Sequence, residues 1–232
     1  MALIGTAGWA IPAQYKAAFP ATGTQLERYA ARLTAVEINS SFYRPHQHKT
    51  YTRWAAGVPD DFRFSVKLPR SITQDKRLRD CDTELARFCG EIAGLGSKLG
   101  VVLVQLPPSL VFDSGVARAF FPRLQGTAAV VCEPRHASWF APDADALLQD
   151  LRVARVAADP PRAPGDGMPG GWTGMAYWRL HGSPKIYYSD YPEGALQALT
   201  PKLRETDWCI FDNTAAFAAL GNALRLTTLR DA

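Results

Sequence analysis

Three short segments of the chain each carry two polar side chains that lie two residues apart. They are Glu37 with Asn39, Glu133 with Arg135, and Arg179 with His181. Side chains at this spacing share one face of a β-strand, so each segment would present two functional groups to one surface. Carboxylates and imidazoles can serve as general acids and bases, and arginine can stabilise developing negative charge. The pattern predicts acid–base chemistry on an anionic substrate.

Other polar residues follow further apolar segments, and the chemistry of each type divides the candidates into two sets. The predicted catalytic residues are Glu37, Glu133, His136 and His181. The predicted substrate- or phosphate-binding residues are Asn39, Lys67, Arg70, Gln105, Arg135, Asp159, Arg179 and Asn213. A structural interpretation stays open, in which the acids, with Asp212, neutralise the cations in a buried layer of ion pairs.

Eight short segments rich in β-forming residues must position these groups. They are Ile4–Gly8, Ala35–Ser40, Arg63–Leu68, Val101–Leu106, Val130–Glu133, Val153–Asp159, Ala176–His181 and Trp208–Asn213. Helical patterns follow most of them; for example, Leu85, Phe88 and Ile92 recur at helical spacing. Residues 160–172 differ, because their many prolines and glycines exclude a helix there.

This alternation predicts an α/β fold, a TIM-type (β/α)8 barrel. Residues 1–232 would form it as a single domain, with helix 6 replaced by the Pro/Gly-rich loop. A doubly wound open sheet is the alternative, but no Gly-x-Gly-x-x-Gly motif follows a strand. Polar residues stand at the C-terminal ends of seven of the eight predicted strands, where barrel enzymes have their active sites.

The composition limits the class of protein. The 232 residues are 47% hydrophobic and 21% charged, which is enough to form a core. Apolar runs are only a few residues long, so we expect neither a membrane span nor a membrane partner. The four cysteines form no Cys-x-x-Cys motif, and the N-terminus does not resemble a signal peptide. These features predict a cytoplasmic protein with free thiols.

A basic segment follows the third predicted strand. Residues 63–79 hold six basic side chains and one acid, a local net charge of +5 within a chain whose net charge is +4. Such a segment attracts phosphate groups or a nucleic-acid backbone. We therefore predict an anionic small molecule or a nucleic acid as the partner, while the oligomeric state stays unknown. For the outer arginines, a solvated surface is the alternative.

Three functions are compatible with these residues. The first is an enzyme of hydrolase or lyase type that acts on a phosphate-bearing or nucleic-acid substrate. The second is a glycoside hydrolase in which Glu37 and Glu133 form the carboxylate pair. The third is a non-catalytic nucleic-acid-binding barrel. Metal-ligand residue types occur, but no His-x-x-x-His or His-Glu-x-x-His motif does, so the cofactor stays unknown and no metal ligand is assigned.

Seven motifs, in chain order, together resemble the YecE-like family, otherwise called domain of unknown function 72. They are Gly5-Thr-Ala-Gly-Trp9, Val36-Glu-Ile-Asn-Ser-Ser-Phe-Tyr43, Lys67-Leu-Pro-Arg-Ser-Ile-Thr73, Gln105-Leu-Pro-Pro108, Glu133-Pro-Arg-His-Ala-Ser-Trp139, Arg179-Leu-His-Gly182 and Phe211-Asp-Asn-Thr214. The resemblance implies a TIM-type barrel and no particular reaction. The chain departs from the family pattern at Gln74, where histidine is usual, and at Asp212, where asparagine is common.

Overall fold

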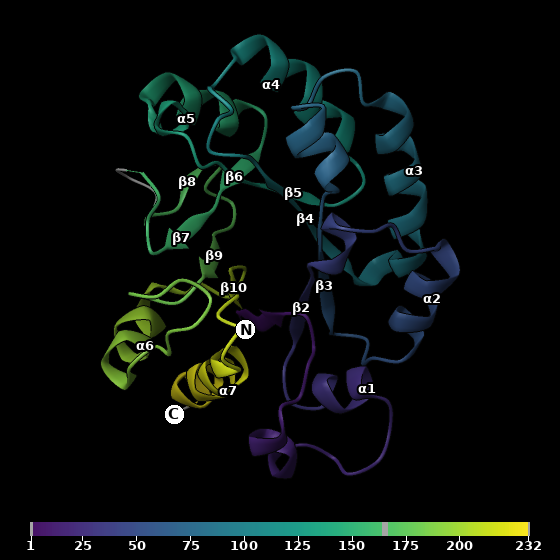
Figure 1. Ribbon diagram of the computed structural model, residues 1–232, viewed down its shortest axis with the longest axis vertical. Coiled ribbons are helices and arrows are strands. Elements are labelled where there is room, and N and C mark those ends of the chain that lie inside the picture. The colour runs from purple at the N-terminus through teal and green to yellow at the C-terminus, as the bar shows by residue number, and fades with distance from the viewer. Residues whose placement is uncertain (1, 164–166, 232) are drawn as a thin grey trace.

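The computed structural model describes residues 2–163 and 167–231, and its strands form the wall of a barrel surrounded by helices (Figure 1). Within those residues ten strands form one sheet in the order β7-β9-β10-β1-β2-β3-β4-β5-β6-β8. Their bounds are β1 Leu3–Ala7, β2 Ala35–Ile38, β3 Arg63–Lys67, β4 Leu99–Gln105, β5 Ala129–Glu133, β6 Val153–Arg155, β7 Ala157–Asp159, β8 Gly170–Gly171, β9 Tyr177–Leu180 and β10 Trp208–Phe211.

The barrel closes through its sixth strand. β6 and β7 are separated only by Val156; β6 pairs in parallel with β5, and β7 pairs in parallel with β9. The two short strands are therefore successive halves of one barrel strand, and each half bonds to a different neighbour. The predicted (β/α)8 barrel is confirmed, with one difference: the segment Val153–Asp159 is two strands rather than one.

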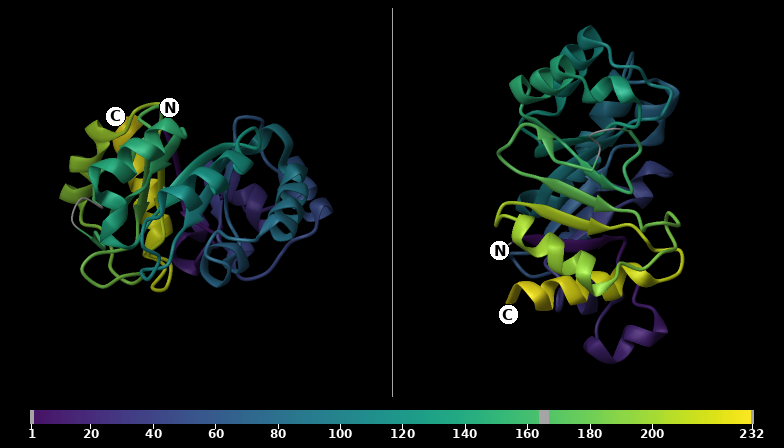
Figure 2. Two further views of the ribbon diagram at one scale, coloured as in Figure 1. Left: turned by 90° about the horizontal axis from the view of Figure 1, so that it is seen from above. Right: turned by 90° about the vertical axis from the view of Figure 1, so that its left-hand side faces the viewer.

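Helices follow the barrel strands on the outside of the wall (Figure 2). The α-helices are α1 Gln25–Ala30, α2 His48–Ala56, α3 Asp82–Ile92, α4 Ser114–Phe120, α5 Pro142–Asp150, α6 Glu193–Leu199 and α7 Ala218–Asp231. Helix α1 begins at a capping box, in which the Thr24 hydroxyl accepts from the Glu27 amide and the Glu27 carboxylate accepts from the Thr24 amide. None of the helices in the described part of the chain is long and apolar enough to cross a membrane.

A loop takes the place of a helix after the sixth barrel strand. In its described parts, residues 160–163 and 167–172, the chain forms turns and the short strand β8, which pairs antiparallel with β6. Residues 164–166, which belong to the same predicted loop, lie outside the described residues. Prolines without amide hydrogens cannot support helical hydrogen bonding, which explains the missing helix in the described parts.

The inward-facing side chains divide the barrel interior into an apolar lower part and a polar upper part. Near the middle, an apolar cluster fills the interior, formed by Ala35, Val101, Leu103, Val131, Ala154, Val156, Met175, Tyr177, Trp208 and Ile210. Further toward the C-terminal end of several strands, the same face carries a polar group. On β4, for example, Leu103 is followed by Gln105, and after β10 Ile210 is followed by Asp212. The fold thus gathers the polar strand ends at the C-terminal mouth.

Candidate functional site at the barrel mouth

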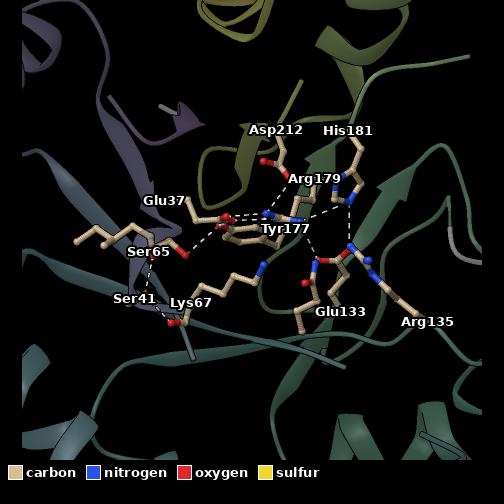
Figure 3. Close-up of polar contacts among 12 residues, drawn as sticks. Glu37, Ser41, Ser65, Lys67, Glu133, Arg135, Tyr177, Arg179, His181 and Asp212 are labelled. Carbon is tan, nitrogen blue, oxygen red and sulfur yellow. Dashed lines mark hydrogen bonds and ion pairs between the residues drawn. The ribbon is translucent and has the colours of Figure 1, made fainter. Parts of the chain in front are cut away.

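Arg179 on β9 lies at the centre of a buried polar cluster (Figure 3). Its Nη2 and Nε donate to the two carboxylate oxygens of Glu37, at 2.8 and 3.0 Å. Its Nη1 donates to Glu133 Oε2 at 3.1 Å, and Nη2 also lies 2.9 Å from Asp212 Oδ2. One guanidinium therefore contacts three carboxylates from β2, β5 and the end of β10, which fits the fork-shaped donor set of arginine.

His181 bridges two of these carboxylates. Its Nε2 lies 3.0 Å from Glu133 Oε1 and its Nδ1 lies 3.1 Å from Asp212 Oδ2. Burial would lower the pKa of His181, but the charge of Glu133 and the hydrogen bonds to Asp212 and Glu133 raise it above its ordinary value. Ionised carboxylates only accept hydrogen bonds, and an imidazolium, which donates from both ring nitrogens, matches this pair of contacts.

Further donors complete the coordination of the two glutamates. Gln105 Nε2 donates to Glu133 Oε2 at 2.7 Å, and Arg135 Nη2 donates to Glu133 Oε1 at 3.1 Å. The Tyr177 hydroxyl donates to Glu37 Oε2 at 3.0 Å. We call Glu37, Glu133, Tyr177, Arg179, His181 and Asp212 the buried network.

The charges of the network hold its carboxylates in the ionised form. Burial would raise the pKa of Glu133, but Arg179, Arg135 and His181 together hold it well below its usual range. Burial likewise opposes ionisation of Asp212, whereas Arg179 and His181 lower its pKa. Each side chain of the pair Arg179 and Glu37 is at most 1% exposed. The network is a saturated buried ion cluster, as the structural interpretation of the sequence anticipated.

Above the network, a pocket of about 460 Å³ opens at the barrel mouth. Its polar lining residues are Asn39, Lys67, Gln74, Gln105, Arg135, Asp212 and Thr214, and its aromatic ones are Phe42, Tyr43, Tyr187 and Tyr188. We call it the mouth pocket. A hollow of about 500 Å³ occurs at Gln125, Arg152 and Trp172, beside the amino-terminal ends of β5 and β6 and away from the polar strand ends.

Lys67 differs from the cations of the network. Its Nζ lies 4.1 Å from the centre of the Phe42 ring. Among the described residues no carboxylate oxygen lies within ion-pairing distance of it, although the residue is only 4% exposed. Burial lowers the pKa of Lys67 to about 8; Arg179 acts in the same direction, and Glu37, Glu133 and Asp212 oppose it. A substantial fraction of this amine is therefore neutral near physiological pH.

Two other groups around the mouth pocket have buried atoms without a hydrogen-bond partner among the described residues, namely Asn39 Oδ1 and Arg135 Nε. The backbone at Tyr187 is strained, because its φ of 69° is unfavourable for any residue other than glycine. Its ring meets the His181 ring edge-on at 5.8 Å. Unsatisfied polar atoms and strained backbone cluster at binding sites, and here both border one pocket.

The family model described as "Protein of unknown function DUF72" matches residues 3–232. The chain belongs to this family. Curated relatives include UPF0759 protein YecE of Escherichia coli K12, which is 30% identical over 61% of this chain and 51% of its own length. UPF0759 protein YunF of Bacillus subtilis is 27% identical over 61% of this chain and 53% of its own length. The matched regions thus span about half the length of these relatives.

Solved structures of DUF72 family proteins share the fold. One from Enterococcus faecalis superposes with a TM-score of 0.82 at 18% identity, covering all of this chain and 96% of its own. Another, from Thermotoga maritima, gives a TM-score of 0.78 at 23% identity and covers both chains fully. At these identities the likeness establishes the barrel alone.

In this DUF72 member, eight of the twelve predicted site residues lie in the buried network or line the mouth pocket. They are Glu37, Asn39, Lys67, Gln105, Glu133, Arg135, Arg179 and His181. They come from β2, β3, β4, β5 and β9 or from the residues directly after them. Their convergence follows from the closed ring of parallel strands.

The remaining four predicted residues lie elsewhere. Arg70 is exposed and pairs with Asp75 at 3.3 Å. His136 Nδ1 lies 2.9 Å from the Ser138 hydroxyl, Asp159 accepts from the Tyr191 hydroxyl at 2.6 Å, and Asn213 donates to Asn222 Oδ1 at 2.9 Å. None of the four lines the mouth pocket.

Several basic side chains of the segment after β3 have partners on the surface. Lys76 pairs with Glu84 at 2.8 Å, Arg79 pairs with Asp113 at 2.8 Å, and Arg77 donates to the Ser109 carbonyl at 2.7 Å. Two of these three contacts are with acids outside residues 63–79, which offset part of the net charge of +5 counted in the sequence. These arginines belong to the surface alternative rather than to the pocket.

Sequence reasoning did not select Tyr177 or Gln74 as site residues. Tyr177 stands two residues before Arg179, so the strand period that marked Arg179 also placed Tyr177 on the inner face. Gln74 lines the mouth pocket and donates to the Gln105 carbonyl at 3.2 Å; it is a position where the chain departs from the family pattern. Among the described residues, no group of three or more His, Cys, Asp or Glu is arranged to hold a metal ion.

Proposed function

We propose that the protein is an enzyme of hydrolase or lyase type that acts on a small phosphate-bearing molecule bound in the mouth pocket. The observation that carries this proposal is the placement of Lys67 and Arg135, each with bonding capacity left free, on one small polar pocket. Arginine and lysine are the side chains that bind phosphate in proteins. Amide groups of Asn39, Gln74 and Gln105 add donors on the same lining.

The size of the pocket supports a small substrate. Its volume of about 460 Å³ falls in the range of small-molecule sites. Tyr43 and Tyr188 stand at its edge and are 74% and 50% exposed, so they can cover a bound molecule. A nucleic-acid strand would need a longer cationic track, and the arginines that could form one, such as Arg70 and Arg79, pair with acids instead.

Asp212 is the group best placed for proton transfer. It lines the pocket, its low pKa keeps it ionised, and His181 and Arg179 fix its orientation through Oδ2. It can accept a proton from a bound substrate or water, while Arg135 and Lys67 balance negative charge that develops on the substrate. Glu37 and Glu133 would not contact the substrate; they fix the positions of Arg179 and His181 by hydrogen bonding to them.

The glycoside hydrolase hypothesis gains no comparable support. Its two carboxylates, Glu37 and Glu133, are buried, bind the same guanidinium and do not line the mouth pocket. A carboxylic acid that protonates a leaving group needs a raised pKa, whereas Arg179 and Arg135 hold the pKa of Glu133 well below its usual range.

Inorganic phosphate is the probe that tests the proposal. We expect phosphate to raise the melting temperature of the protein and to give a saturable signal in titration calorimetry, because a ligand that binds only the folded state stabilises it. Replacing Arg135 by glutamine should weaken binding at least tenfold, since it removes a charged contact worth about 1.5–3 kcal/mol.

Arg79→Gln is the matched control, because Arg79 is exposed and pairs with Asp113 outside the pocket. It should bind phosphate as the wild type does. Equal loss in both variants, or binding that neither variant changes, would contradict the placement of phosphate in the mouth pocket. Tight binding of a single-stranded oligonucleotide that weakens steeply with salt would favour the nucleic-acid alternative instead.

A further inference from the structure

Lys67 is placed as a nucleophile as well as a cation. Its side chain leaves the end of β3 and points toward Arg179 and Glu133 of the buried network (Figure 3). The ammonium group rests on the Phe42 ring at 4.1 Å and lines the mouth pocket. A lysine whose purpose is to pair with acids would be expected to contact one of the three nearby carboxylates, yet all three are bound to Arg179.

The contacts of Arg179 explain why the amine is left unpaired. The three nitrogens of the Arg179 guanidinium contact the carboxylates of Glu37, Glu133 and Asp212. The positive charge of Arg179 therefore lies near Lys67, where it disfavours the protonated amine. A desolvated lysine next to a second cation is a known way to obtain a nucleophilic amine at neutral pH. The partly buried Lys98 shows the alternative arrangement, since its Nζ donates to the carbonyls of Ala55 and Val58 and lies 3.6 Å from Asp60 Oδ1.

We propose that Lys67 is a catalytic residue that condenses with the carbonyl group of a phosphate-bearing aldehyde or ketone, forming an imine in the mouth pocket. This inference rests on the proposed function and deepens it, because it names a carbonyl as the second required feature of the substrate. It also favours the lyase type over the hydrolase type, since a protonated imine withdraws electrons from the neighbouring carbon–carbon bond.

The step balances without a further reactant. The Lys67 ammonium group first gives up one proton, and the neutral amine then attacks the carbonyl carbon, so that a carbon–nitrogen bond forms and the carbonyl π electrons become a lone pair on oxygen. That oxygen takes one proton from the nitrogen and the proton given up at the start, the carbon–oxygen bond breaks, and water leaves. The ammonium form of Lys67 and one carbonyl group thus give one protonated imine and one water. Asp212, which lines the same pocket, can accept a proton from the nitrogen and return it to the leaving oxygen.

Reductive trapping with glycolaldehyde phosphate tests the proposal. The aldehyde is incubated with the wild-type protein and cyanoborohydride, and the alkylated lysines are located by peptide mass spectrometry. The lower pKa gives Lys67 roughly 100-fold or more of the neutral amine found on an exposed lysine at neutral pH. We therefore expect the adduct on Lys67 at least tenfold faster than on the exposed Lys16 or Lys49.

The pH profile gives a second readout that a purely structural lysine would not share. Labelling of Lys67 should rise to half its maximum near pH 8, the pKa set by burial and by the charges that face it. Those charges are Arg179 on β9, Glu37 on β2, Glu133 on β5 and Asp212 after β10. A lysine with the ordinary pKa of 10.5 would instead keep gaining label as the pH rises well above 8.

The variants separate this inference from the proposed function. Lys67→Arg keeps a cation but removes the amine, so it should lose the adduct, whereas Lys49→Arg should keep it. Because the wild-type peptide map identifies the lysine directly, the test stands even if Lys67→Arg folds poorly. Unphosphorylated glycolaldehyde is the matched probe, and we expect it to label Lys67 at least tenfold more slowly.

Each outcome decides one point. Phosphate binding with no preferential adduct on Lys67 would overturn the imine and leave the proposed function intact. A fast adduct on Lys67 with both aldehydes equally would support the nucleophile and contradict a phosphate-bearing substrate. Absence of both phosphate binding and the adduct would overturn both.

Discussion

The buried network and the mouth pocket lie next to each other and use the same residue types, but they differ in how fully their polar atoms are paired. In the network, Arg179 contacts three carboxylates and His181 contacts two. In the pocket, Asn39 Oδ1 and Arg135 Nε lack partners among the described residues, and Lys67 rests on an aromatic ring.

This difference separates structural roles from ligand binding. Apart from Asp212, which also lines the pocket, the members of the network are paired with one another, so they stabilise the folded chain and offer little bonding capacity to a substrate. Unsatisfied groups beside a pocket lower the stability of the free protein and gain partners when a ligand binds. The comparison therefore predicts opposite signs for substitutions in the two regions: loss of stability in the network and gain in the pocket.

The largest effect is expected for Arg179→Met in the network. The substitution leaves Glu37, Glu133 and Asp212 buried without their shared cation, which should lower the free energy of unfolding by about 3–5 kcal/mol. Urea denaturation followed by tryptophan fluorescence measures it.

Arg87→Met is the control for that substitution. Arg87 pairs with Glu91 at 3.7 Å on the surface of α3, with its side chain 56% exposed, so its loss should cost less than about 0.5 kcal/mol. A network variant no less stable than this control would refute the structural role of the cluster.

A smaller effect of opposite sign is expected for Lys67→Met. Because the folded state lowers the pKa of Lys67 from 10.5 to about 8, it binds this proton more weakly than the unfolded chain does. The protonated amine therefore lowers stability at pH values below 8. Removing it should raise the free energy of unfolding at neutral pH by about 1–3 kcal/mol, given about 1.4 kcal/mol per pKa unit.

The pH dependence sharpens this expectation. The gain should shrink as the pH rises above 8 and vanish above 10.5, where the amine is neutral in both states. Lys98→Met is the matched control, since Lys98 Nζ donates to two carbonyls at 2.8 and 2.6 Å; it should lose about 1–3 kcal/mol. If Lys67→Met lost stability as Lys98→Met does, the expectation that substitutions in the mouth pocket stabilise the protein would be wrong.

The smallest effect is expected for His181→Gln, and it depends on pH in the other direction. The folded state raises the pKa of His181 above 6.5, so the charged ring adds stability that is fully present below 6.5 and is lost as the pH rises through the raised value. Below that pH the variant should be less stable by about 1–2 kcal/mol.

Unfolding curves across this pH range, with the exposed His48→Gln as control, measure the difference. A gap between wild type and variant that stays constant with pH would mean that His181 is not an imidazolium in the folded state.

The sequence alone determined the barrel and the inner faces of its strands. Short runs of apolar, β-forming residues, such as Val101–Gln105, predict a strand, and the backbone period of two then fixes which of its side chains share a face. The same period predicted that Glu37, Glu133, Arg179 and His181 lie together at the C-terminal mouth of the barrel. Turn chemistry likewise excluded a helix in the described parts of the loop after the sixth strand.

Only the tertiary structure decided which of these residues pair with one another through hydrogen bonds and ion pairs, and which face a pocket. Glu133 and Lys67 have the same kind of strand-end position in the sequence, yet one is saturated by Arg179 and His181 and the other has no ion pair among the described residues. Arg70 was a predicted phosphate ligand, yet it pairs with Asp75 on the surface, and Arg79 of the same basic segment pairs with Asp113. Such pairing depends on distances of a few ångströms between segments far apart in the chain, and no local pattern encodes those distances.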